Sequence, residues 1–151
     1  MIKELDITNR KVAEEVLNVQ LLSYQIEADI IGFSDLPPLK DTVETLQPCG
    51  ETFFGYFINE ELCGAISIKI EKDMVDIHRL IVHPKHFRKG IAEKLLNIIE
   101  KKQEVEKVIV STGSKNTPAV QFYLKHGFQV VEEIKVNEHL SLTRFEKKRS
   151  F

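Results

Sequence analysis

The chain has 151 residues, of which 42% are hydrophobic and 29% charged, and its formal net charge is −2. This length predicts one domain, residues 1–151, because single hydrophobic cores commonly span about 100 to 200 residues. The nearly balanced charge gives no electrostatic reason to expect a nucleic acid or a membrane surface as a partner.

The sequence shows neither the apolar pattern of a leader peptide nor the residue spacing of a metal site. Residues 1–10 have no apolar leader segment, and no run of about 18 apolar residues occurs. We therefore expect a cytoplasmic protein. Cys49 and Cys63 lack the paired spacing of a metal site, and no cluster of His, Cys and carboxylates indicates one, so we expect no metal.

The first third of the chain predicts a short strand, a long helix and a loop. Apolar residues at positions 2, 5 and 7 indicate the strand, and Thr8 and Asn9 are good helix caps. Residues spaced by three or four then predict one apolar helical face: Ala13, Leu17, Leu21, Tyr24, Ala28 and Ile31. Gly32 ends this helix. Three prolines in residues 33–50 predict a loop, with at most a short helical segment around residues 41–46.

The rest of the chain alternates strands and helices. We expect strands at residues 52–58, 62–70, 74–82, 107–112, 129–136 and 140–145. We expect helices at residues 90–101 and 117–126, the second capped by Thr117 with Pro118 in its first turn. Residues 74–82 are apolar on both faces, as is typical of a central strand. This order predicts an α/β fold, or α+β, with a mixed sheet flanked by helices.

The segment from Leu80 to Leu96 predicts an anion site. A central strand leads into a basic loop, and the loop opens a helix at Gly90. The first amides of a helix lack intrahelical partners and lie at the positive end of its dipole, so they can hold a phosphate. The alternative is a solvated basic turn formed by Arg88 and Lys89. P-loop and Rossmann glycine motifs are absent, which argues against those nucleotide-binding classes.

The same residues resemble a known family. Val82-His83-Pro84 followed by Arg88-Lys89-Gly90-Ile91-Ala92 resembles the pyrophosphate-binding motif of the GNAT superfamily of acyl-CoA N-acyltransferases. A second segment resembles that family's later motif through Asn116, Ala119, Phe122-Tyr123 and Gly127-Phe128. The two motifs come in the family's order, about 25 residues apart, which strengthens the resemblance.

The resemblance implies a sheet of about six or seven strands with about four helices, splayed between its two central strands. It implies acetyl-CoA as the acyl donor, with its pyrophosphate on the amides of Arg88, Lys89, Gly90, Ile91, Ala92 and Glu93. It also implies that the backbone of Leu80, Ile81 and Val82 contacts the pantetheine arm. Asn116 either hydrogen-bonds that arm or caps the following helix, and the sequence leaves both roles open.

By the same resemblance, Tyr123 is the general acid that protonates the departing thiolate. The alternative is a core aromatic residue beside Phe122. Two positions depart from the family pattern: Phe87 stands where Gln or Arg is usual, and His78 stands where many members have a glutamate base. His78 is therefore our candidate base, or else a structural histidine bonded to Asp76.

Strand alternation predicts which face each side chain of the central strand occupies. His78 is expected on the face of Leu80 and Val82, whereas Arg79 is expected on the opposite face in a structural ion pair. By the resemblance, the acceptor site is lined by the end of the first helix, the loop after it and the final strand pair. Tyr24 and Glu27 are its candidate residues, and each has an ordinary structural or solvated role as the alternative.

The predicted function is acetyl transfer from acetyl-CoA to a primary amine of a small molecule or peptide, directly and in a ternary complex. An alternative is a CoA-binding or sensing module without turnover, which the lack of a carboxylate base favours. A third reading, a covalent carrier using Cys49, lacks a matching Cys and His pair. The sequence predicts a monomer or homodimer.

Overall fold

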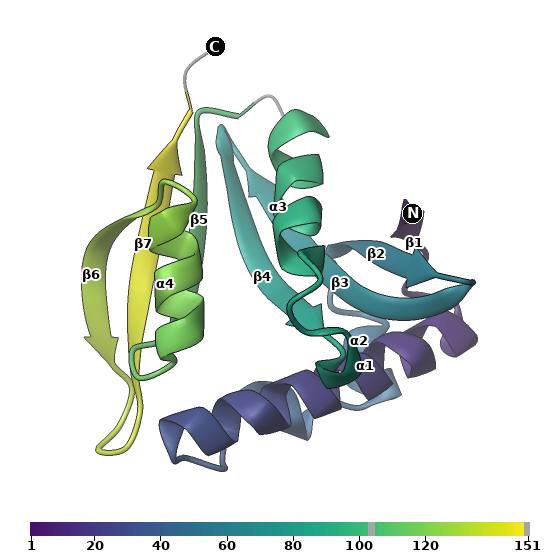
Figure 1. Ribbon diagram of the computed structural model, residues 1–151, viewed down its shortest axis with the longest axis horizontal. Helices are drawn as coiled ribbons and strands as arrows, with labels where there is room; N and C mark the ends of the chain where they lie inside the picture. The colour runs from purple at the N-terminus through teal and green to yellow at the C-terminus, as the bar shows by residue number, and fades with distance from the viewer. Residues whose placement is uncertain (103–104, 150–151) are drawn as a thin grey trace.

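The structure is a computed structural model that describes residues 1–102 and 105–149. Its strands form a seven-stranded sheet in the order β1-β2-β3-β4-β5-β7-β6, in which only β4 and β5 run parallel (Figure 1). The strands are β1 (Ile2–Leu5), β2 (Thr52–Ile58), β3 (Glu61–Glu71), β4 (Met74–Val82), β5 (Lys107–Gly113), β6 (Gln129–Lys135) and β7 (Ser141–Lys148). The expected mixed α/β fold is therefore confirmed.

Four α-helices and two 3-10 segments complete the fold of the described residues. They are α1 (Arg10–Ile31), η1 (Pro37–Lys40), α2 (Val43–Leu46), η2 (Pro84–His86), α3 (Ile91–Lys102) and α4 (Thr117–Lys125). Asn9 caps α1 by accepting from the Val12 amide, and Gly32 ends it in the left-handed conformation, with φ 77°. The cap of α4 is Asn116, so the expectation that Thr117 caps this helix is wrong. Asn and Thr are both good N-cap residues, so the sequence alone does not decide which of two neighbouring positions caps the helix.

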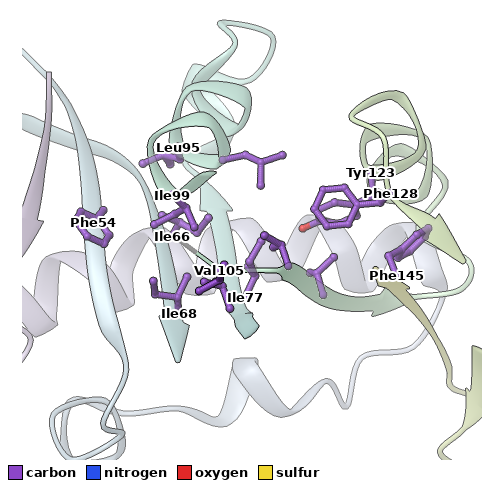
Figure 2. Close-up of a cluster of buried hydrophobic side chains, with 14 of the residues drawn as sticks. Phe54, Ile66, Ile68, Ile77, Leu95, Ile99, Val105, Tyr123, Phe128 and Phe145 are labelled. Atoms are coloured by element: carbon purple, nitrogen blue, oxygen red, sulfur yellow. The ribbon is translucent and has the colours of Figure 1, made fainter. Parts of the chain in front are cut away.

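The helices cover opposite faces of the sheet. Leu95, Leu96 and Ile99 of α3 pack in one core with Phe54 of β2, and Figure 2 shows this cluster beneath α3 and α4. Val16 of α1 packs in a second core with Phe53 of β2. Phe53 directly precedes Phe54, so its side chain lies on the opposite face of the sheet. No helix of the described residues is both long and apolar enough to cross a membrane.

A β-bulge at His78 interrupts the alternation of β4. Arg79 pairs with Ser67 of β3 but Ile77 pairs with Ile68, so His78 is one extra residue on β4. After the bulge the faces change: Ile77 belongs to the α3-side core, whereas Ile81 belongs to the α1-side core. The expectation that His78 shares a face with Leu80 and Val82 is therefore wrong, because those two pack toward α3 while His78 contacts carboxylates on the other side.

The two central strands separate after the bulge. β4 and β5 pair only from Met74–Lys107 to Ile77–Val110, and the ribbons diverge beyond that point (Figure 1). The edge of β4 from His78 to Val82 consequently has no ladder partner on the side of β5. This confirms the splay that the family resemblance implies, and it leaves polar backbone groups open to a ligand.

Candidate active site

A cavity of about 330 Å³ lies where β4 and β5 separate. Its walls come from α1, η1, the splayed parts of β4 and β5, α4 and the end of the β6–β7 hairpin. Tyr24, Glu27, His78, Asn116 and Tyr123, all singled out in the sequence, line it together. The volume is at the lower end of the range for small-molecule sites.

Tyr123 is held by aromatic neighbours on the inner side of α4. Its ring centroid lies 5.4 Å from that of Phe128 and 5.5 Å from that of Phe145, and the residue is 5% exposed. Its hydroxyl oxygen points away from both phenylalanine rings (Figure 2). Burial raises the pKa of Tyr123, and the neighbouring Tyr24 and Glu27 raise it further. The phenol therefore keeps its proton at neutral pH and is available as a donor.

Glu27 of α1 reaches β5 across the cavity. Thr112 Oγ1 donates to Glu27 Oε1 at 3.4 Å, and the Asn116 side chain and the Gly113 amide also hydrogen-bond this carboxylate. Burial raises the pKa of Glu27, and these three hydrogen bonds oppose part of the rise. A Cβ at Gly113 would lie 2.5 Å from Ile31 Cδ1, so any other residue here would require the end of the Ile31 side chain to move.

Asn116 has a structural role that the sequence left open. Its side-chain oxygen accepts from the Ala119 amide at 3.4 Å, which caps α4. The same side chain also hydrogen-bonds Glu27, and the residue is buried. The cap therefore ties the first turn of α4 to the acidic group on α1.

His78 lies between two carboxylates. Its Nε2 is 3.4 Å from Asp76 Oδ2 and its Nδ1 is 3.8 Å from Glu51 Oε2, and its side chain is 33% exposed. A carboxylate near each ring nitrogen fixes the orientation of the imidazole. Asp76 was weighed as a partner from the sequence, whereas nothing in the sequence indicates Glu51, which precedes β2 by one residue.

Arg79 contacts the same glutamate as its neighbour His78. Its Nε donates to Glu51 Oε1 at 2.9 Å, and its Nη1 donates to Asp41 Oδ2 at 2.6 Å and to Gln20 Oε1 at 2.8 Å. The expected ion pair of Arg79 is confirmed. Its expected separation from His78 on the opposite face is wrong, because the bulge directs both side chains toward Glu51.

The loop before α3 has the backbone shape of an anion cradle. Arg88 and Gly90 take the left-handed conformation, with φ 65° and 75°, and a Cβ on Gly90 would meet nothing within 4 Å. The Lys94 backbone amide donates to the Gly90 carbonyl at 3.1 Å and makes the first hydrogen bond of α3. The amides of the residues between them have no partner within the helix. Lys89 Nζ lies 2.8 Å from His86 Nδ1, and the side chain of Phe87 is exposed.

Two other chemistries find less support in the geometry. Burial raises the pKa of the Cys49 thiol, which disfavours the thiolate that a covalent carrier needs. Among residues 1–102 and 105–149, no group of three or more His, Cys, Asp or Glu side chains is arranged to hold a metal ion.

Comparison with known families identifies the fold. Residues 39–149 match the family model described as an acetyltransferase (GNAT) domain. The chain belongs to the GNAT acetyltransferase family. The family resemblance found in its two motifs is confirmed.

Two relatives and one solved structure show how far the likeness extends. The chain is 40% identical over 146 residues to the UPF0157 protein YqkA of Bacillus subtilis, across 96% of this chain but 43% of that protein. It is 28% identical to a streptothricin acetyltransferase of Escherichia coli, across 82% of this chain and 73% of that protein. The chain thus spans less than half the length of YqkA.

The solved structure is the PaiA N-acetyltransferase of Thermoplasma acidophilum in complex with coenzyme A. It superposes with a TM-score of 0.79 at 22% identity, covering 99% of this chain and 98% of that one. At this identity the likeness establishes the GNAT fold.

The residues of this GNAT domain fit coenzyme A. The loop ahead of α3 offers main-chain amides beside an open space at Gly90, with the exposed Arg88 and Lys89 next to it. The unpaired edge of β4 from His78 to Val82 offers backbone donors and acceptors to an extended arm. Together these two features match the two parts of the cofactor, its phosphates and its extended arm.

Proposed function

We propose that this GNAT domain transfers an acetyl group from acetyl-CoA directly to a primary amine of a small molecule or peptide. The observation that carries the proposal is the cavity that brings Tyr123, His78 and Glu27 to the unpaired edge of β4. The CoA-bound PaiA neighbour and the streptothricin acetyltransferase relative support the choice of donor and reaction. We also propose that residues 1–151 act as one domain in the cytoplasm, as a monomer or homodimer.

Main-chain groups are proposed to bind the donor. The amides of Arg88, Lys89, Gly90, Ile91, Ala92 and Glu93 would hold the pyrophosphate at the positive end of the α3 dipole. The backbone of Leu80, Ile81 and Val82 would hydrogen-bond the pantetheine arm along the open edge of β4. Acetyl-CoA, when bound, supplies the activated thioester.

Side chains of the cavity are proposed to carry the proton transfers. His78, oriented by Asp76 and Glu51, accepts a proton from the acceptor amine, directly or through water. The neutral amine nitrogen then forms a bond to the carbonyl carbon and the carbon–sulfur bond breaks. Tyr123 donates its phenolic proton to the departing sulfur, and the second proton lost by the nitrogen restores the phenol, so no covalent acyl-enzyme is needed. Tyr24 and Glu27 line the acceptor side, and Asn116 positions Glu27.

The proposal is tested by following thiol release from acetyl-CoA with a panel of primary amines. We expect release that depends on the amine and a matching acetylated product detected by mass spectrometry. Calorimetry with CoA is run on the same protein. Tight CoA binding without thiol release for any amine would contradict acetyl transfer and favour a CoA-sensing module.

A further inference from the structure

The cavity contains an acidic group whose charge is not balanced by the protein. Among the described residues that line it, the charged side chains besides the titratable His78 are Glu27 and Arg79. Arg79 is matched by Asp41 and Glu51 at 2.6 and 2.9 Å. Glu27 receives only neutral hydrogen bonds, from Thr112, Asn116 and Gly113, and forms no salt bridge within residues 1–102 and 105–149. The side chain is half-buried, so its charged form is costly, and either a proton or a bound cation relieves that cost.

The part of the acceptor wall formed by the end of α1, the residue before η1 and the start of β7 is apolar. Ile31 of α1, Leu36 before η1 and Leu140 before β7 form a small buried cluster, and Leu142 packs against it. All four also line the cavity. A second ammonium group placed against this wall would lose its hydration without gaining a partner, whereas a hydrocarbon group would be stabilised.

Glu27 also lies close to the proposed reaction centre. It and Tyr24 are near enough to Tyr123 to raise the pKa of that phenol through their charges. The carboxylate is held in place by its hydrogen bonds to Thr112, Gly113 and Asn116. An ammonium group paired with Glu27 therefore lies next to the phenol that faces the departing sulfur.

We propose that the acceptor is a compact amine with one positive charge beside an apolar body, and that Glu27 selects it by binding its ammonium group. This inference rests on the proposed acetyl transfer and narrows its substrate class. Glu27 acts here as a residue that determines specificity. The single carboxylate in the cavity and the apolar wall beside it disfavour a polycationic acceptor.

The test measures ligand binding by calorimetry to protein saturated with CoA. The probe is 2-phenylethylamine, and 2-phenylethanol is its uncharged counterpart. We expect the amine to bind at least about tenfold more tightly, since a charge-assisted hydrogen bond contributes that much. In Glu27→Gln, which keeps the size of the side chain, we expect this preference to disappear. The control is Asp29→Asn, two residues after Glu27 on the exposed face of α1, and this variant should keep the preference for the amine.

Spermidine, with three positive charges, supplies the second comparison, and thermal melting checks that each variant is folded. We expect spermidine to bind more weakly than 2-phenylethylamine. Equal or tighter spermidine binding, an amine preference unchanged in folded Glu27→Gln, or no binding of 2-phenylethylamine would overturn the inference. Acetylation of other amines in any of those cases would leave the proposed function standing. Glu27-dependent amine binding without acetyl transfer to any amine would instead support the ammonium site and overturn the proposed function.

Discussion

Arg79 and Glu51 form a shielded ion pair, with Nε and Oε1 2.9 Å apart and the two side chains 13% and 6% exposed. Breaking such a pair by removing one partner leaves the other charge unpaired, which typically costs about 3 to 5 kcal/mol. We therefore expect Glu51→Gln to lower the free energy of unfolding by about 3 kcal/mol, measured by urea titration at pH 7. Glu44→Gln is the control, since its ion pair with Arg10 is exposed and should contribute little. Equal effects of the two changes would contradict the prediction.

The same pair predicts how stability depends on pH. Burial favours a higher pKa for Glu51, but the hydrogen bonds from Arg79 and Ser67 outweigh it and hold the pKa below its ordinary value of 4.5. The stabilisation is therefore complete above pH 4.5 and is lost as the pH falls from there through the folded-state pKa. We expect the wild-type free energy of unfolding to fall more steeply between pH 5 and 3 than that of Glu51→Gln. Parallel profiles would argue against this role for Glu51.

Two glycines allow a matched test of the anion site. Gly90 and Gly50 have φ values of 75° and 76°, and a Cβ on either would meet nothing within 4 Å. Alanine at each position should thus cost a similar 1 to 2 kcal/mol or so through the left-handed backbone alone. Only Gly90→Ala should weaken CoA binding in calorimetry, because it alone shapes the loop ahead of α3. Unchanged CoA affinity in that variant would place the pyrophosphate elsewhere.

The base assignment is tested by replacing His78 with glutamine. If the imidazole takes the amine proton, kcat at neutral pH should fall by about 10²- to 10⁴-fold, with CoA affinity unchanged. His139→Gln is the control, since its ring stacks on Phe33 near the closing hairpin, away from Asp76 and Glu51. A loss no greater in His78→Gln than in His139→Gln would assign His78 a structural role.

Local patterns predicted the order of strands and helices because each element carries its own periodicity. The bulge at His78 was not predictable in this way, since it arises from pairing between β3 and β4 rather than from residues 74–82 alone. That one extra residue explains why alternation placed His78 on the face of Leu80 and Val82 and opposite Arg79. The splay of β4 and β5 came from the family resemblance, and the pairing confirms it.

Only the site residues that belong to family motifs, or to segments that the family uses for its acceptor site, were predictable from the sequence. Asn116 and Tyr123 were found because they belong to a recognisable spacing, and Tyr24 and Glu27 because the family places its acceptor site at the end of the first helix. Glu51 contacts His78 and Arg79 across 27 and 28 residues of sequence, and no local signal predicts such a contact. The pairing of Arg79 with both Asp41 and Glu51 was likewise not predictable, because the fold alone brings these three residues together.

Tyr123 provides the most direct test of the mechanism. Burial and the nearby Tyr24 and Glu27 raise the pKa of its phenol above the ordinary value of 10.0, so the protonated form should persist throughout the working pH range. If this proton goes to the departing sulfur, Tyr123→Phe should keep the fold and CoA affinity while lowering kcat by about 10- to 10⁴-fold. The aromatic packing against Phe128 and Phe145 stays, because only the oxygen is lost.

Tyr24→Phe is compared with Tyr123→Phe, because it also removes one phenolic oxygen from the cavity wall but on the acceptor side, where it should change the KM of the amine more than kcat. Stopped-flow measurement of thiol release with a competent amine separates the chemical step from product release in both variants. A thiolate is already a good leaving group, so an effect near the lower end of the range is compatible with the acid role. Wild-type kcat in Tyr123→Phe would show that Tyr123 packs in the core and donates no proton.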